Sequence, residues 1–153
     1  MKTFAAIALG LVACGGSPAG TEPVPADVSA APLQATVSGT PVTVTAYAWR
    51  NMMPGDGSLD RRLAVSLTLH PVNGTRWPAN TSVQRAWVIR NDQAWVASEF
   101  ETQNTGGNDL QVVTRGGPLW PVGDAVEVVV ELRDANGAMV KLKSTRVTIE
   151  GPV

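Results

Sequence analysis

Histidine is the side chain best suited to proton transfer near neutral pH, and this sequence of 153 residues has one, His70. A Ser-His-Asp triad around it is conceivable, because triads are defined by geometry and not by order along the chain. The Gly-x-Ser-x-Gly motif that presents the nucleophile in one large class of hydrolases is absent from the sequence. Since Pro71 follows directly, we interpret His70 as a solvent-facing residue where a strand meets a loop.

Paired carboxylates could support glycoside hydrolysis, which places two acidic side chains about the scissile bond. Glu99 and Glu101 share a face if their segment is extended, and Glu127 and Glu131 share a face of another segment. Both faces are simply polar, so solvation explains the pairs without an active site. We therefore expect no enzymatic activity, and keep a hydrolase as the weaker alternative.

Metal-binding patterns are incomplete. Residues 56–60 read Asp-Gly-Ser-Leu-Asp, with oxygen donors at alternate positions as at the start of a calcium loop. The sixth and twelfth positions, which need Gly and Glu, hold Arg61 and Leu67. The methionines at 52–53 together with His70 would suit copper, but one histidine without a methionine cluster is weak evidence. We expect no metal site.

Tryptophan is frequent here, with five residues against one Tyr and two Phe. An exposed indole ring can stack on a sugar face or anchor a protein interface. Trp77 lies beside Arg76 in the turn-rich segment 73–80, Trp120 lies in another turn, and Trp95 lies in an expected strand. These four side chains are our candidate ligand- or partner-binding residues. The alternative is that the rings fill the core or close its ends.

The amino terminus carries the features of a secretion signal. Lys2 precedes an apolar run over residues 3–11, far short of the roughly 20 residues needed to span a bilayer. Leu11-Val12-Ala13-Cys14 contains the only cysteine and closely resembles the lipobox of bacterial lipoproteins. The resemblance implies a signal peptide over residues 1–13 and a mature chain that begins at Cys14, acylated with diacylglycerol and an N-acyl chain such as palmitate. The alternative is an ordinary small residue in a conventional signal.

Acylation would anchor the protein in a bacterial cell envelope. Each buried CH₂ contributes about 0.8 kcal/mol, and stable anchoring needs more than one chain. Gly15 stands where an Asp would mark inner-membrane retention in many two-membrane bacteria, so the resemblance favours the outer membrane. We expect no cofactor apart from this covalent lipid.

Charge and cysteine content restrict the remaining classes. Twelve Lys and Arg against thirteen Asp and Glu give a formal charge of −1. A near-neutral chain lacks the basic surface that nucleic acid requires. A single cysteine allows no internal disulfide, so the fold must rest on its core, which 44% hydrophobic residues make feasible.

Composition divides the chain into a tether and a domain. Residues 14–32 are rich in Pro, Gly and Ala, and they offer too little apolar surface to offset the entropy of ordering. We expect a disordered, semi-flexible tether there. From residue 33 to residue 153 apolar and polar residues alternate, clearly so over 42–49, 63–70 and 126–133. This period of two predicts strands with one buried face, and an all-β sandwich of about seven strands.

Two hairpins follow from turn residues. The sequence Asp-Ala-Asn-Gly at 134–137 suits a three-residue loop, and that register sets Glu131 opposite Lys141. The parity of the inward residues changes after this hairpin, which predicts a β-bulge or a change of sheet near residues 143–146.

The second hairpin turns at Asn91 and Asp92 and pairs Arg90 with Gln93. This register places Val88 opposite Trp95 and Trp87 opposite Val96. The two tryptophans therefore point to opposite faces of the sheet, so one is core and the other is exposed or covered by another element.

Residues 119–126 contain a Leu-x-Pro turn that leads into alternating valines. This segment resembles the loop before the penultimate strand of fibronectin type III and bacterial immunoglobulin-like domains, and implies an antiparallel immunoglobulin-like sandwich. The match covers about a tenth of the chain. No Tyr follows the proline, and the immunoglobulin cysteine pair is absent.

Together these features predict a lipid-anchored envelope protein with a non-catalytic binding, adhesion or scaffolding domain. Specificity would lie in loops, with residues 52–60 and 73–80 as candidates. The main alternative is a carbohydrate-binding module that uses exposed tryptophans. The expected partners are the membrane, through the lipid, and an envelope protein or glycan, with no nucleic acid.

Overall fold

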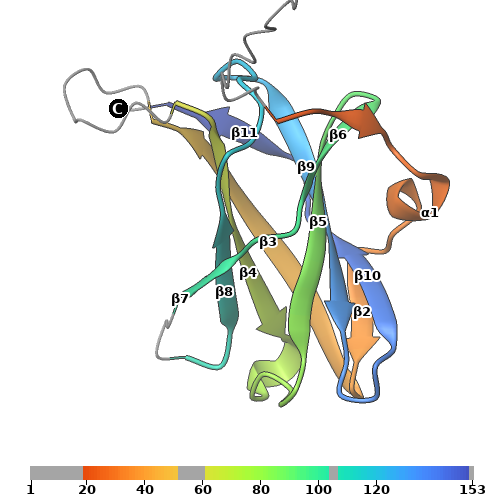
Figure 1. Ribbon diagram of the computed structural model, residues 1–153. Coiled ribbons are helices and arrows are strands. Elements are labelled where there is room, and N and C mark those ends of the chain that lie inside the picture. The colour runs from red at the N-terminus through yellow and green to blue at the C-terminus, as the bar shows by residue number, and fades with distance from the viewer. Residues whose placement is uncertain (1–18, 52–60, 104–106, 152–153) are drawn as a thin grey trace, which may run out of the picture.

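The protein is all-β in the computed structural model, which describes residues 19–51, 61–103 and 107–151 (Figure 1). One short helix, α1 (Ala26–Ser29), and one 3₁₀ turn, η1 (Val72–Gly74), accompany the strands in these ranges. The strands are β1 (Glu22–Pro23), β2 (Gln34–Val37), β3 (Thr40–Arg50), β4 (Leu63–Pro71), β5 (Ser82–Arg90), β6 (Gln93–Ala97), β7 (Glu101–Gln103), β8 (Leu110–Thr114), β9 (Ala125–Arg133), β10 (Met139–Lys143) and β11 (Val147–Glu150).

The strands pack as a two-layer sandwich. One layer, here the β4 sheet, has the order β3-β4-β8-β7, with β2 beside the first part of β3. The other, the β5 sheet, has the order β6-β5-β9-β10, with β1 on its edge. This arrangement of the main strands is that of immunoglobulin-like sandwiches, which confirms the predicted all-β sandwich. The sheet is mixed and not purely antiparallel as expected, because β11 runs parallel to β3. The expected number of about seven strands is too low, because short edge strands such as β1, β2 and β7 have no clear alternation in sequence.

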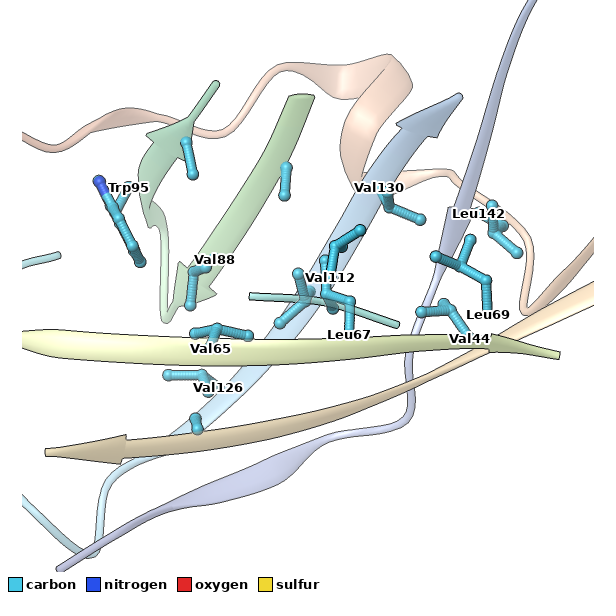
Figure 2. Packing of buried hydrophobic residues seen from close by; sticks show 14 of the residues in the cluster. Val44, Val65, Leu67, Leu69, Val88, Trp95, Val112, Val126, Val130 and Leu142 are labelled. Carbon is cyan, nitrogen blue, oxygen red and sulfur yellow. The ribbon is translucent and has the colours of Figure 1, made fainter. Parts of the chain in front are cut away.

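The core fills the space between the sheets (Figure 2). Inward residues of β3 and β4, such as Val44, Leu67 and Leu69, meet Val88 and Val130 from the β5 sheet. Each inward residue alternates with an outward one, as the period of two predicted. Because the chain has no internal disulfide, burial of these aliphatic side chains is the main source of its stability.

Both predicted hairpins are confirmed. β9 and β10 pair with Glu131 opposite Lys141, and Gly137 adopts the left-handed conformation (φ 83°) that a three-residue loop requires. β5 and β6 pair with Val88 opposite Trp95 and with Arg90 opposite Gln93. Trp95 accordingly lies in the core between the sheets, whereas Trp87 faces the other side.

The last strand changes sheets where a bulge or switch was predicted. β10 pairs with β9, and after a break β11 runs parallel to β3, with a short antiparallel contact to β9. Ser144 in the break is 1% exposed. Its Oγ accepts from the Val128 amide at 3.1 Å and donates to the Thr145 carbonyl at 2.8 Å. These bonds give backbone groups at the switch the partners that a regular strand ladder would otherwise provide.

The expectation of a disordered tether is wrong for residues 19–32, here called the N-terminal strap. β1 pairs with β6, and α1 lies on the outer side of the β5 sheet (Figure 1). Val28 and Ala31 are buried against Trp87, Ile89 and other apolar residues of that sheet. The composition is too poor to bury a core of its own, but a few apolar side chains of the strap, Val24, Val28 and Ala31, are enough because the sheet supplies the rest of the cluster.

A cation holds the strap at α1. Lys141 Nζ lies 2.8 Å from Glu131 and 3.2 Å from Asp27 of the strap, and 5.7 Å from the centre of the Trp87 ring. The bond to Glu131, with that to Asp27, raises the pKa of Lys141 above its usual value. The bond from Lys141 lowers the pKa of Asp27. Trp87 also lies under Arg85, at 5.6 Å.

We expect Ser144→Ala to lower the free energy of unfolding by about 1–3 kcal/mol, because the buried Val128 amide loses its acceptor. Urea denaturation followed by circular dichroism measures the change. The control is Ser98→Ala at an exposed position, which should stay within about 0.5 kcal/mol of the parent. Equal stability of the two variants would contradict this account of the strand switch.

Candidate functional site

The outer face of the β4 sheet carries a groove lined by side chains from four strands. The registers place Thr45 of β3 beside Thr68 of β4, and Thr68 beside Gln111 of β8. Gln111 in turn pairs with Gln103 of β7. A cavity of about 450 Å³ opens over this row and its neighbours, and its lining comprises Thr45, Ala46, Tyr47, Trp49, Ser66, Thr68, Gln103, Gln111, Val113 and Arg115. We call this the outer groove.

Two aromatic rings form one end of the outer groove. Tyr47 and Trp49 point outward from β3 because they share the parity of its threonines. Their ring centroids are 5.5 Å apart with an interplanar angle of 24°, so the rings stack. Tyr47 is 55% exposed, and Trp49 is half-buried. The stack covers one face of each ring and leaves Tyr47 as an exposed aromatic side chain on a polar sheet face.

A cation lies against this aromatic pair. The Arg115 guanidinium carbon lies 5.6 Å from the centre of the Trp49 ring. Arg115 Nε is also 3.8 Å from a carboxylate oxygen of Glu101, an exposed and therefore weak ion pair. The guanidinium thus keeps donors free for a ligand bound beside Trp49.

The middle of the outer groove is lined by hydroxyl and amide groups. Gln111 donates from Nε2 to the Ser66 Oγ at 3.0 Å, which fixes the orientation of the amide. Thr68 lies between Thr45 and Gln111 in the same row. Hydroxyl groups both donate and accept hydrogen bonds, so this strip suits a ligand that does the same.

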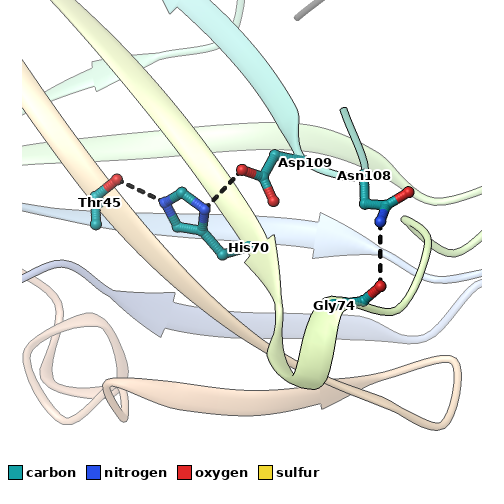
Figure 3. Close-up of polar contacts among 5 residues, drawn as sticks. All are labelled: Thr45, His70, Gly74, Asn108 and Asp109. Atoms are coloured by element: carbon teal, nitrogen blue, oxygen red, sulfur yellow. Dashed lines mark hydrogen bonds and ion pairs between the residues drawn. The ribbon is translucent and has the colours of Figure 1, made fainter. Parts of the chain in front are cut away.

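A chain of hydrogen bonds joins Asp109, His70 and Thr45 on the same sheet face (Figure 3). His70 Nδ1 lies 2.9 Å from Asp109 Oδ2, and His70 Nε2 lies 2.9 Å from Thr45 Oγ1. Since an ionised carboxylate only accepts, Nδ1 carries a proton, and in the neutral imidazole Nε2 then accepts from the Thr45 hydroxyl. His70 does lie near the end of β4, as predicted, but it is bonded on both sides instead of simply solvated.

The loop before β8 brings Asp109 to His70. Asn108 donates from Nδ2 to the Gly74 carbonyl at 3.1 Å (Figure 3) and accepts at its own carbonyl from the Trp77 amide at 3.1 Å. These bonds fasten the loop to the connection between β4 and β5. Asp109 and His70 are 39 residues apart, so spacing in the sequence gave no indication of the pair.

The order carboxylate–imidazole–hydroxyl is that of a catalytic triad, but its surroundings do not fit acyl transfer. Thr45 lies in the middle of β3, so its side chain stands roughly perpendicular to the sheet while the strand amides lie in the plane of the sheet. No backbone donor of β3 is therefore directed at an oxyanion formed above Thr45. The His70 and Asp109 side chains are 36% and 39% exposed, so water is not excluded.

The four binding candidates from the sequence do not form one site. Trp95 and Trp120 are 5% and 8% exposed and belong to the core, which leaves almost no ring face for a ligand. Trp77 is half-buried and packs on the core, with its Nε1 3.4 Å from the Thr81 carbonyl, and Arg76 is exposed beside it. The interpretation of these tryptophans as core and closing residues fits their burial better.

Trp120 closes one end of the sandwich. Arg90 lies over its ring at 5.8 Å and pairs with Asp124 at 2.6 Å. The Leu-x-Pro turn precedes β9, which is the third strand from the end because β10 and β11 follow it, and not the penultimate strand that the resemblance implied.

Comparisons with known proteins give no match for this chain. No family model, no curated protein and no solved structure matches it. The immunoglobulin-like description therefore rests on the strand order alone.

Other predicted features lie partly outside the described residues. Cys14 and residues 52–60, which include the calcium-like sequence and Met52-Met53, are among the residues that the structure does not describe. Within residues 19–51, 61–103 and 107–151, no group of three or more His, Cys, Asp and Glu side chains could hold a metal ion. In the same ranges no helix has the length and apolarity to cross a bilayer.

Acrylamide quenching tests the arrangement of the tryptophans. Trp49→Phe and Trp77→Phe should each lower the quenchable fraction of the fluorescence, because both rings are half-buried. Trp95→Phe should leave that fraction unchanged, because a ring in the core is shielded. If strong quenching disappeared only in Trp95→Phe, Trp95 would be the exposed ring and its assignment to the core would be wrong.

Proposed function

We propose that this protein is a lipid-anchored, non-catalytic binding module of the bacterial cell envelope, and that its ligand binds in the outer groove of the β4 sheet. The anchor is the lipid on Cys14, implied by the lipobox resemblance, and Gly15 favours the outer membrane. The binding surface is thus a sheet face and not the loops 52–60 and 73–80.

The contrast between the two outer faces carries this proposal. On the β5 sheet the outward Trp87 is 4% exposed, because the strap, Arg85 and Lys141 cover it. On the β4 sheet Tyr47 remains 55% exposed and stacked on Trp49. Among residues 19–51, 61–103 and 107–151, one aromatic face is covered by the chain and the other is open, which supports the open face as the binding surface.

Catalysis is the weaker alternative because no amide of β3 is directed at an oxyanion above the triad-like chain Asp109–His70–Thr45, and because this chain lies open to water. The same side chains suit binding, since they hold the Thr45 hydroxyl in one orientation at the rim of the outer groove.

The anchor is tested by Cys14→Ser, which removes the thiol that lipidation requires. We expect loss of labelled palmitate incorporation and release of the protein from the membrane fraction on cell fractionation. Ser17→Ala, three residues further on, should remain labelled and membrane-bound. Membrane retention of the Cys14→Ser protein would refute the lipid anchor.

The binding surface is tested by photo-crosslinking in cells. Benzoylphenylalanine replacing Gln103, at the rim of the outer groove, should form adducts in the envelope. The same replacement of Asn136, exposed at the tip of the β9–β10 hairpin, should form none. The double change Tyr47→Ala/Trp49→Ala should lower the adduct yield about tenfold, since each aromatic contact contributes about 0.5–1.5 kcal/mol.

Circular dichroism should show that the double variant is still folded, because Tyr47 is mostly exposed. Adducts at position 136 in equal yield, or adducts at 103 that survive the double change, would place the binding surface elsewhere.

A further inference from the structure

We infer that the ligand of the outer groove is a saccharide chain that lies across the strands from Tyr47 and Trp49 on β3 to Gln103 on β7. This inference rests on the proposed function, because it names the chemical class of what the same surface binds. Three features of the lining carry it: an exposed aromatic ring held in a stack, a strip of neutral polar groups, and the near absence of net charge.

The aromatic pair suits the apolar face of a sugar ring. A pyranose presents a row of polarised C–H groups on one face, and these pack against the electron-rich face of an aromatic ring. Tyr47 and Trp49 are stacked to within 24° of parallel, so each ring covers one face of the other, and the open outer face of Tyr47 is the platform for the sugar. The platform is already ordered by the stack and by Arg115, which lowers the entropy lost on binding.

The neutral strip suits sugar hydroxyls. Thr45, Ser66, Thr68 and Gln111 supply hydroxyl and amide groups along the outer groove. A sugar hydroxyl both donates and accepts, and it needs partners that do the same without the desolvation cost of a charge. The side chains around the strip are fixed, since Gln111 bonds to Ser66 at 3.0 Å and Thr45 bonds to His70 at 2.9 Å.

His70 and Asp109 fix the hydrogen-bonding role that the Thr45 hydroxyl offers to a ligand in the outer groove. With the Nδ1 proton directed at Asp109, Nε2 of the neutral imidazole accepts a hydrogen bond from the Thr45 hydroxyl. The lone pairs of Thr45 Oγ1 then remain for a donor from the ligand. His70 is thus a positioning residue, and it acts through Thr45.

Other ligand classes fit less well. Nucleic acid needs several cations for its phosphates, and Arg115 is the one cation among the described residues that line the outer groove, with Glu101 beside it. An extended peptide would add to a sheet edge, and the edge strand β7 has three residues. A lipid tail needs an apolar lining, whereas this lining is mainly hydroxyl and amide.

The test is binding of defined oligosaccharides to the lipidated full chain in nanodiscs. The probes are three kinds of saccharide chain: neutral cello-hexaose, N-acetylated chito-hexaose, and acidic galacturonic-acid oligomers. We expect at least one to bind, measured by calorimetry. If only the acidic oligomers bind, and Arg115→Gln abolishes that binding, the carboxylate of the ligand pairs with Arg115. If the neutral oligomers bind, the ligand of the outer groove is a neutral glycan.

Matched variants locate the binding. Tyr47→Ala and Gln111→Met should each weaken it fivefold or more, because they remove a stacking face and an amide. Arg76→Ala, an exposed change outside the outer groove, should leave it unchanged. Thr45→Val should weaken it as His70→Gln does, and the two changes together should add nothing, since His70 acts only through Thr45.

Binding that is lost in Arg76→Ala but kept in Tyr47→Ala would overturn the assignment to the outer groove. If none of the three classes binds while crosslinking at position 103 still depends on Tyr47 and Trp49, the saccharide inference is false and the binding function stands. If that crosslinking fails as well, both are false.

Discussion

The pairing register of β3 and β4 is the constraint on which the rest of the structure depends. The two strands pair continuously from Val42 opposite Pro71 to Arg50 opposite Leu63. In this register Val44, Leu67 and Leu69 point into the core. The intervening residues point outward and form the outer groove. A slip of one residue would turn the aliphatic set to solvent and bury the polar one, so the energy of the core also fixes the site.

The two outer faces of the sandwich differ in whether the chain covers their apolar side chains. The apolar residues outside the β5 sheet are covered by a strap of the same chain, with Lys141 binding both Glu131 and Asp27. The aromatic residues outside the β4 sheet have no such cover in the described chain. The strap docks on the outer face of the β5 sheet and the outer groove lies on the outer face of the β4 sheet, so the two lie on opposite faces of the sandwich (Figure 1).

The sequence predicted what depends on local pattern. Alternation predicted the principal strands, and turn residues predicted both hairpins and the change of sheet near Ser144. The strap was missed because its docking depends on Trp87, a residue far along the chain whose burial alternation alone leaves open. The aromatic platform does have a signal in the sequence: Tyr47 and Trp49 occupy the polar parity of β3, where large aromatic side chains are out of place unless they are covered or bind something.

The hydrogen-bonded chain Asp109–His70–Thr45 shows why geometry must decide between catalysis and binding. The same three groups would activate a nucleophile if the hydroxyl stood at a sharp turn beside free backbone amides in a closed site. On a flat strand, with half-exposed partners, they remove the rotational freedom of one hydroxyl and set its direction. That is what a binding surface requires, because a fixed acceptor among other fixed hydroxyls and amides recognises a pattern of ligand donors at little entropic cost. The absence of a second histidine in the sequence does not weaken this role, since one oriented hydroxyl needs one imidazole.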